Sequence, residues 1–407
     1  MLTDNKIDPR YAVVAGACLM QFMIVGLMFS YSIFFKTFED EFGWSRTVLS
    51  AAMSLAFLVM GVLAGVMGHL GDRFGPRVVL SVTGVAYGLG FALISQISEP
   101  WQLFLIVGIF IGLGLSTHDV VTLSTVARCF DKRRGMMTGV VKTGTAAGQM
   151  ALPLLAAFLI ASYDWRTAIW TLGVVAACSL VIAAFLVGLP VKPAGSNVDA
   201  GGPSTGLAAA LKSRVFWTLC AIQFLFFPSL TTIPLHLPVF GMDLGMSTSR
   251  AATLLSVIAG ASVLGRLVIG TFSDRIGGRR GFMLCLLPLT GGLLAFSVID
   301  TRTALFVAAL AYGFAHGGLF TIVAPTVAEY FGTRSVGAIF GGIVFFGTVG
   351  GAIGPVLAGR VFDVTGSYVI AFLTLASMAT LALLLVVSLP RKAKDGGMTN
   401  TAASYEQ

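Results

Sequence analysis

Three charged side chains stand inside long apolar stretches of the sequence, where a charge is unfavourable. Arg266, Lys142 and Asp119 each lie about 12 Å along a helix from the nearest charged turn, at 1.5 Å rise per residue. A charged residue at the centre of a membrane helix costs about 2.5–3.5 kcal/mol on insertion scales, so it marks a functional position. The permanently charged, planar guanidinium of Arg266 suits a carboxylate, which it can bind through two parallel hydrogen bonds. These residue types indicate anion binding and proton transfer.

Asp119 and Lys142 have opposite charges at a similar depth, which leaves several interpretations open. We expect Asp119, together with His118, to take up and release a proton, because a carboxylate that loses a cationic partner binds a proton more readily. The alternatives are a permanent Asp119–Lys142 salt bridge, or a Lys142 ammonium that reaches back to the membrane surface. His316, expected in the outer half of its helix, is either a second proton carrier or a packing residue.

Aromatic residues on two of the apolar stretches are candidate walls of the same cavity. They are Phe29 and Tyr31 on the first stretch and Phe345 and Phe346 on the eleventh. Aromatic side chains in membrane helices also face lipid or pack in the core, so their types alone do not decide between wall and core.

The composition indicates which solvent surrounds these residues. Of the 407 residues, 56% are hydrophobic and 11% are charged, with a mean hydropathy of +0.91. A soluble domain carries about a quarter charged residues, and a helix needs about 20 apolar residues to cross a bilayer. The apolar runs fall at about 11–35, 47–68, 78–97, 102–127, 136–161, 167–189, 215–240, 250–272, 281–299, 303–330, 335–361 and 367–389. The sequence therefore predicts an all-α membrane protein with twelve transmembrane helices.

Basic residues predict the organisation and orientation of the chain. Most of the 26 Lys and Arg residues, including 132–134 and 279–280, fall on the side of the N-terminus, and net charge is +8. Basic loops stay cytoplasmic, so we expect both termini in the cytoplasm and the chain in the cell inner membrane. The polar N-terminus runs into a long apolar helix without a small-residue cleavage site, so no cleaved signal peptide is expected. The predicted segments are 1–189, a six-helix bundle; 190–213, a cytoplasmic linker; 214–390, a second six-helix bundle; and 391–407, a cytoplasmic tail.

The two halves repeat each other. The segment 68–77 (GHLGDRFGPR) recurs as 270–279 (GTFSDRIGGR), with Asp72 and Asp274 202 positions apart, and the turn at Gly43 recurs at Gly245 with the same offset. This pair of loops resembles the signature of the major facilitator superfamily. The resemblance implies two bundles related by a pseudo-twofold axis, which rock around a central site that faces each side of the membrane in turn.

The resemblance also implies that the repeated loops act as a gate. The carboxylates are expected to accept hydrogen bonds from arginines and backbone amides in one conformation and release them in the other, or the loops are merely solvated basic turns. The gating residues are Gly68, Asp72, Arg73, Gly75 and Arg77 in the first half and Gly270, Asp274, Arg275, Gly277 and Arg279 in the second.

Three further stretches resemble the monocarboxylate and oxalate–formate type carriers: 31–50, 129–148 and 354–368. The resemblance implies that Arg266 holds a substrate carboxylate. The sequence departs from the animal monocarboxylate carriers at Phe29, where they have a lysine, and at Ser262, where they have an aspartate. It also has no lysine in the eleventh stretch, which the oxalate carriers use. These departures leave open how protons are coupled.

No phosphate-binding loop, nucleophile elbow or metal-ligand spacing occurs in the sequence, and the five cysteines are scattered. We therefore expect no enzyme activity, cofactor, metal or nucleic acid, and a monomer in the lipid bilayer. The resemblance and Arg266 predict proton-coupled symport of a small monocarboxylate such as lactate or pyruvate. A dicarboxylate or oxalate–formate-like exchanger is the alternative, since Arg266 and Lys142 together suit a dianion. A cation or drug exporter fits a basic cavity poorly, and a sensor usually carries a soluble domain.

Overall fold

The computed structural model describes residues 8–130, 134–188, 207–299, 301–332 and 336–390. Within these ranges twelve helices are long and apolar enough to span a membrane, as predicted. The first half contains α1 (Pro9–Phe42), α2 (Arg46–Phe74), α3 (Pro76–Ile94), α4 (Pro100–Leu105), the π-helix η1 (Ile106–Ile111), α5 (Gly112–His118), α6 (Val120–Cys129), α7 (Arg134–Ser162) and α8 (Trp165–Val187). The second contains α9 (Leu207–Ala210), α10 (Arg214–Asp243), α11 (Thr248–Ile276), α12 (Gly278–Val298), α13 (Arg302–Phe331), α14 (Val336–Thr365) and α15 (Val369–Ser388).

Local sequence sets where several of these helices begin. Pro76 stands in the first turn of α3, where a missing backbone N–H leaves no bond unmade. The Ser45 side chain caps α2 by accepting from the amide of Val48, and the Asp164 side chain caps α8 by accepting from the amide of Thr167. The hydroxyl and amide of Thr167 lower the pKa of Asp164, so this cap stays charged.

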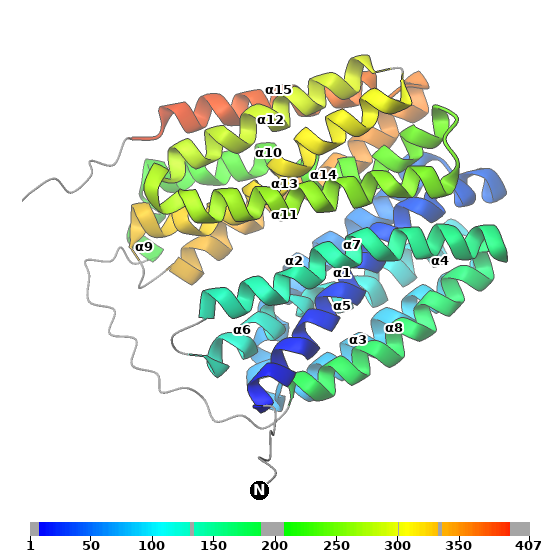
Figure 1. Cartoon of the computed structure of the whole chain (residues 1–407), viewed down its shortest axis with the longest axis horizontal. Helices are drawn as coiled ribbons and strands as arrows, with labels where there is room; N and C mark the ends of the chain where they lie inside the picture. Colours follow the sequence, from blue (N-terminus) through cyan, green and yellow to red (C-terminus); the bar gives the residue numbers. More distant parts are fainter. Residues whose placement is uncertain (1–7, 131–133, 189–206, 300, 333–335, 391–407) are drawn as a thin grey trace, which may run out of the picture.

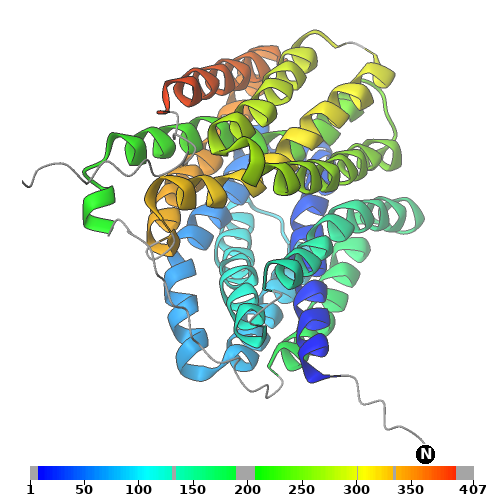
Figure 2. The ribbon, with the colours of Figure 1, turned by 60° about the vertical axis from the view of Figure 1, so that its left-hand side comes forward.

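The helices form two bundles, one from α1–α8 and one from α10–α15 (Figures 1 and 2). Their repeated turns have the same geometry: φ is +65° at Gly43 and +76° at Gly245, and +82° at Gly75 and +78° at Gly277. Only glycine adopts such angles without strain, which explains its recurrence at these points. The prediction of two pseudo-symmetric six-helix bundles is confirmed.

Glycines bring the central helices of each bundle into backbone contact. A Cβ on Gly148 of α7 would overlap the carbonyl oxygen of Phe22 in α1. A Cβ on Gly317 of α13 would overlap the carbonyl oxygen of Ser262 in α11. Small residues allow such close approach between membrane helices. These two contacts fix the helices that carry the charged residues.

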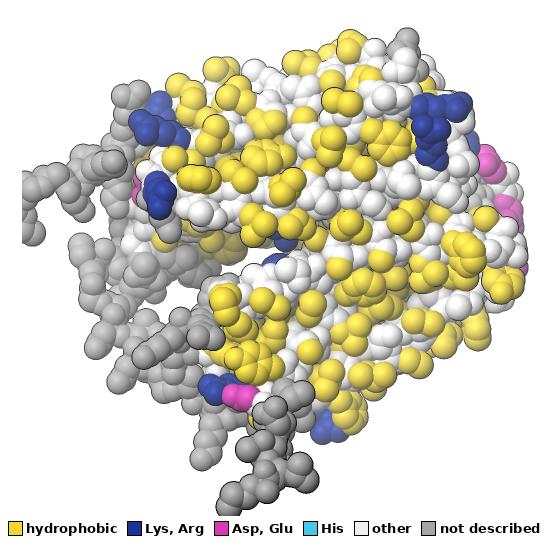
Figure 3. Space-filling model, in the orientation of Figure 1, with side chains coloured by type: hydrophobic (Ala, Val, Ile, Leu, Met, Phe, Trp, Pro, Cys, Tyr) yellow, Lys and Arg dark blue, Asp and Glu magenta, His cyan; other side chains and the backbone are white. Residues whose placement is uncertain are grey.

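The two ends of the molecule differ. We call the end with the Gly75 and Gly277 turns the motif end, and the end with the Gly43 and Gly245 turns the far end. The bundles meet along α2 and α14, α7 and α11, and α1 and α10. Figure 3 shows a hollow between the bundles that opens at the end where Figure 1 places α6 and α9, the motif end, with Lys or Arg side chains at its inner limit.

Parts of the predicted segmentation fall outside the described residues. The predicted linker is described only over 207–213, where it includes α9, and the predicted tail 391–407 lies wholly outside.

The glycine contact between α11 and α13 predicts a matched pair of stability changes. Gly317→Ala forces a methyl against a backbone carbonyl, so we expect a loss of about 1–3 kcal/mol, seen as a lower thermal-unfolding midpoint of the purified protein. Gly291→Ala on α12 has no atom within 4 Å of the added Cβ and should leave the midpoint unchanged or slightly higher. Equal midpoints for both variants would contradict close packing of α11 against α13.

Candidate functional site

The fourth membrane span is broken at Asp119, ten residues before its end. The segment from Pro100 to Cys129 passes through the π-helix η1, and the α-helical pattern is interrupted at Asp119 between α5 and α6. Such interruptions free backbone carbonyls and are frequent at functional sites. In this span, Gln21 of α1 donates from its amide nitrogen to the carbonyl of His118 at 2.9 Å. The break therefore presents a carboxylate and a satisfied carbonyl to α1.

Asp119 is the centre of a polar network. Its Oδ1 accepts from the Lys142 ammonium at 2.5 Å and from Gln21 Nε2 at 2.7 Å, and His118 Nε2 lies 3.6 Å from the same oxygen. Thr145 donates to Gln21 Oε1 at 2.9 Å, which fixes the orientation of that amide. Asp119 thus accepts a charge-assisted bond and an amide bond, which stabilise its ionised form.

The Asp119–Lys142 pair also faces the hollow. The Asp119 side chain is 44% accessible and that of Lys142 is 29% accessible, although both lie within membrane spans. The charge of Asp119 interacts with that of Arg266 in the other bundle, which places the carboxylate at the interface between bundles. Of the alternatives drawn from the sequence, the salt bridge is present in this conformation.

Arg266 carries the uncompensated charge of the site. It forms no hydrogen bond or ion pair with any residue that the structure describes, and its Nε is buried without a partner. Its guanidinium carbon lies 5.8 Å from the centre of the Phe320 ring, a weak cation–π contact from α13. The charge balance of Lys142, Asp119 and Arg266 is one net positive, located on Arg266.

His316 lies at the level of Arg266. Its Nδ1 is 3.4 Å from the hydroxyl of Ser262, one helical turn before Arg266, and its ring is 5.1 Å from that of Phe320. The side chain is 3% exposed. The structure therefore brings His316 to the second-bundle wall of the site, beside the free guanidinium.

The predicted aromatic walls take other places. Tyr31 is fully buried in the first bundle, where its hydroxyl donates to the carbonyl of Leu49 at 3.0 Å. Phe29 packs with an apolar cluster of α1, α7 and α11 that contains Ile33 and Leu255. Phe346 packs edge-to-face on Trp217, with ring centres 5.9 Å apart. Phe345, which contacts Phe346, is 52% exposed. Among the described residues, none of the four forms a hydrogen bond or a cation–π contact with Asp119, Lys142 or Arg266.

In the first half, the predicted gating residues contact other helices of the same bundle. Asp72 accepts from Arg128 of α6 at 2.5 Å, between side chains that are each more than half exposed. A Cβ on Gly68 would lie 2.9 Å from Val120, so α2 approaches α6 closely at this glycine. The guanidinium of Arg77 stacks on Phe185 at 3.6 Å. The remaining motif residues are Gly75, which forms the positive-φ turn, and Arg73, whose guanidinium lies 5.2 Å from the Phe74 ring.

The second copy of the motif uses different partners. Glu329, at the position equivalent to Arg128, accepts from the amide of Gly278 at 2.6 Å. Arg279 donates to the carbonyl of Val387 at 2.6 Å, and Arg275 is exposed in the last turn of α11. Gly277 forms the positive-φ turn and Gly270 lies one turn before Asp274, whose side chain is outside the described residues.

A buried charge cluster at the far end was not predicted from the sequence. Arg46 is 1% exposed and binds Asp243 through two bonds of 2.7 and 2.9 Å, Glu39 through bonds of 3.0 and 3.1 Å, and the Tyr368 hydroxyl at 2.9 Å. The amides of Arg46 and Thr47 also donate to Asp363 at 3.0 and 2.9 Å. We call these six residues the far-end cluster. It joins α1 and α2 of the first bundle to α10, α14 and the start of α15 in the second.

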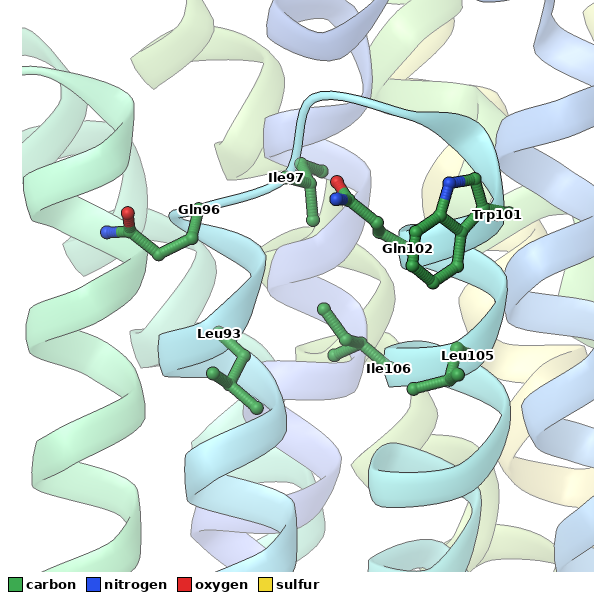
Figure 4. Close-up of a pocket in the computed structure, with 7 residues that line it drawn as sticks. All are labelled: Leu93, Gln96, Ile97, Trp101, Gln102, Leu105 and Ile106. Carbon is green, nitrogen blue, oxygen red and sulfur yellow. The ribbon is translucent and has the colours of Figure 1, made fainter.

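A shallow pocket lies elsewhere on the molecule, between α3 and the start of the fourth span (Figure 4). It measures 230 Å³, and its lining contains no charged side chain: Leu93, Gln96, Ile97, Trp101, Gln102, Leu105 and Ile106. Its residues belong to the far-end portions of the first bundle, away from Asp119 and Arg266. It is not part of the candidate site.

Comparison with known proteins identifies the family. The model of the Major Facilitator Superfamily matches residues 17–296 and 243–403. The chain belongs to this superfamily. The expectation drawn from the repeated loop motif is thereby confirmed, and the protein is a multi-pass membrane transporter.

Curated relatives and a solved structure agree with this assignment. Monocarboxylate transporter 13 of Rattus norvegicus is 29% identical over 384 residues, covering 93% of this chain and 89% of that protein. Monocarboxylate transporter 11 of Homo sapiens is 26% identical over 396 residues, covering 94% and 83%. The crystal structure of a mutant of the nucleoside transporter NupG shares the fold, with a TM-score of 0.76 and 12% identity over 94% of this chain and 99% of that one.

The polar network predicts that Asp119 and Lys142 are energetically coupled. In a double-mutant cycle of Asp119→Asn, Lys142→Ala and both changes together, we expect a coupling free energy of about 1 kcal/mol, since both side chains are partly accessible. Thermal unfolding of the four purified proteins measures it. Strictly additive effects would show that the pair contributes nothing to the folded transporter.

Proposed function

We propose that this transporter carries small organic monoanions, with monocarboxylates such as lactate or pyruvate as the class, in symport with protons. The observation that supports it is the guanidinium of Arg266, which lies inside the membrane-spanning part with no partner among the described residues. An unpaired charge inside a membrane-spanning bundle is strongly unfavourable, so a ligand of opposite charge has a large affinity to gain there. The monocarboxylate transporters among the relatives are named for substrates of this class.

The charge balance favours a monoanion over a dianion. Asp119 already neutralises Lys142 through a 2.5 Å bond, which leaves a single positive charge at Arg266. A dicarboxylate would need both cations, and therefore a proton on Asp119 before binding. Counterflow in liposomes without a pH gradient separates the two mechanisms: an exchanger needs an anion on the opposite side but no protons.

Asp119 is the proposed site of proton coupling. An incoming carboxylate neutralises Arg266, whose positive charge favours the ionised form of Asp119 in the empty site. Once that charge is neutralised, Asp119 binds a proton more readily. One anion and one proton cross together, which restores the charge balance of the empty site. His118, 3.6 Å away, and His316, beside Arg266, are the imidazoles that can pass the proton to and from the hollow.

The proposed orientation places the motif end in the cytoplasm of a cell with this chain in its inner membrane. The basic loops at that end support it. In that orientation the hollow in Figure 3 faces inward, and the far-end cluster closes the outer side. The proposed functional unit is one chain, since each bundle contributes to one central site.

Arg266→Ala should lower the uptake of radiolabelled monocarboxylate into liposomes by about 100-fold. The reason is that truncating one partner of a buried charge pair, here Arg266 with the substrate carboxylate, costs about 2–5 kcal/mol. Arg266→Lys should recover part of the rate, since an ammonium keeps the charge but not the planar fork. The control is Arg250→Ala, at an exposed position of the same helix. Normal uptake by a correctly inserted Arg266→Ala protein would disprove the substrate assignment.

Asp119→Asn should remove the dependence of uptake on a pH gradient, because an amide cannot bind the coupled proton. Uptake driven by a substrate gradient should remain measurable. Asp40→Asn, at a 64% exposed carboxylate near the far end, is the matched control and should keep the wild-type pH profile. If Asp119→Asn also keeps that profile, Asp119 has no part in proton coupling.

A further inference from the structure

His236 is a buried imidazole that the proposed transport step does not use. It lies in α10, is 0% exposed, and sits between the two bundles beside the far-end cluster. Its Nδ1 is 2.9 Å from the Tyr368 hydroxyl, and its Nε2 is 3.1 Å from both the carbonyl oxygen of Pro355 and the hydroxyl of Ser50. Ser50 belongs to the first bundle and the other two belong to the second, so the ring bridges the bundle interface.

The surrounding bonds assign the proton on this ring. Ser50 donates its hydroxyl proton to the carbonyl of Arg46 at 2.6 Å, and the carbonyl of Pro355 can only accept. His236 Nε2 therefore carries a hydrogen and donates it. Arg46 donates to the Tyr368 oxygen at 2.9 Å, so that oxygen is the acceptor in this bond. The hydroxyl hydrogen of Tyr368 therefore remains available, and it is donated to Nδ1 of His236. The network is satisfied only when Nδ1 is unprotonated, which is the neutral Nε2–H tautomer.

A proton on Nδ1 would break this arrangement in two ways. Nδ1 would become a donor, and among the described residues the Tyr368 hydroxyl would lose its only acceptor. The Tyr368 hydroxyl is the only group between His236 and Arg46 in this chain of bonds, so the positive charges of an imidazolium and of Arg46 would also repel each other. Both effects weaken bonds that hold α2 against α10, α14 and Tyr368.

The other groups around His236 do not offset this. The Phe35 ring of α1 and the Tyr368 ring each pack edge-to-face with the imidazole, with ring centres 5.4 and 5.3 Å from its centre. The charge of Asp363 on α14 favours the imidazolium, but this carboxylate is already bound by the amides of Arg46 and Thr47. Asp243 of α10 and Glu39 of α1 are bound to Arg46. The three carboxylates of the far-end cluster thus bind Arg46 or Thr47 in the first turn of α2, and none of them forms a hydrogen bond with His236.

We propose that His236 is a proton-binding site of the far-end gate: protonation of its Nδ1 from the far side breaks the Arg46–Tyr368–His236 chain and favours opening of that end. The site is distinct from Asp119, which lies on the fourth span of the other bundle. The inference rests on the alternating access of the family and is independent of which anion is carried. Acid on the far side would therefore prepare the transporter to receive substrate there.

The test measures the far-end separation directly, without substrate. Spin labels at Tyr163 and Val364, which are 68% and 66% exposed at the far end of the first and second bundle, report the distance between bundles in nanodiscs. In the open state the His236 ring would be exposed to water, and the range from about pH 7.5 to about pH 5.5 spans the titration of an imidazole in water. Lowering the pH across this range should therefore raise the population with the longer distance by about threefold or more. No change in the wild-type protein would overturn the proposal.

His236→Gln supplies the variant arm, because an amide can accept from Tyr368 and donate to Pro355 but cannot titrate. Its distance distribution should be the same at both pH values, and His236→Asn is measured in the same way if the glutamine protein is not monodisperse. His69→Gln, at an exposed imidazole near the motif end of α2, is the control and should keep the wild-type response. A response that survives in the His236 variants, or disappears in His69→Gln, would overturn the assignment. Since no substrate is present, the outcome is separate from that of the uptake experiments.

Discussion

The proposed transport mechanism rests on one unbalanced charge inside an apolar assembly. Arg266 lies on a membrane-spanning helix, and no carboxylate within the described residues neutralises it, whereas the nearby Lys142 is paired with Asp119. Charges in this environment are tolerated when they face a cavity and meet a counter-charge. The free guanidinium leaves the empty site with one net positive charge, which the proposed anionic substrate would neutralise. The arrangement of two bundles then decides which side of the membrane supplies that anion.

The fold keeps this charge in place through backbone contact and helix interruption. Gly317 lets α13 approach α11 at Ser262, one turn before Arg266, and Gly148 lets α7 approach α1 near Gln21. The break at Asp119 brings its carboxylate to Lys142 and Gln21. The far-end cluster holds the bundles together at one end while the other end is open, so the site in this conformation is accessible from the motif end. Separation of the bundles at the far end would require these bonds to break.

Sequence alone predicted much of this because hydropathy and repetition are strong signals in membrane chains. The twelve spans, the paired glycine turns and the ion pair between Asp119 and Lys142 were all anticipated, the last as one of several alternatives. The network around Gln21 was missed, because an isolated glutamine in an apolar helix gives no sign of its partner 98 residues away. The far-end cluster was missed for the same reason: Arg46 lies at a helix start, where an arginine is ordinary, and its partners Asp243 and Tyr368 are distant in sequence. Spacing along one helix shows neither that the Tyr31 side chain packs in the bundle core nor that Arg266 forms no ion pair with a described carboxylate.

The central claim is that the site recognises one negative charge, and a series of ligands of nearly equal shape tests it most directly. Calorimetric titration of the purified transporter with a short monocarboxylate, its uncharged primary amide and the corresponding dicarboxylate compares affinities without any change to the protein. A single free guanidinium predicts that the monocarboxylate binds at least about 100-fold more tightly than its amide, and more tightly than the dicarboxylate at neutral pH. If the amide binds as well as the carboxylate, the charge of Arg266 does not select the ligand, and recognition of a single negative charge is disproved.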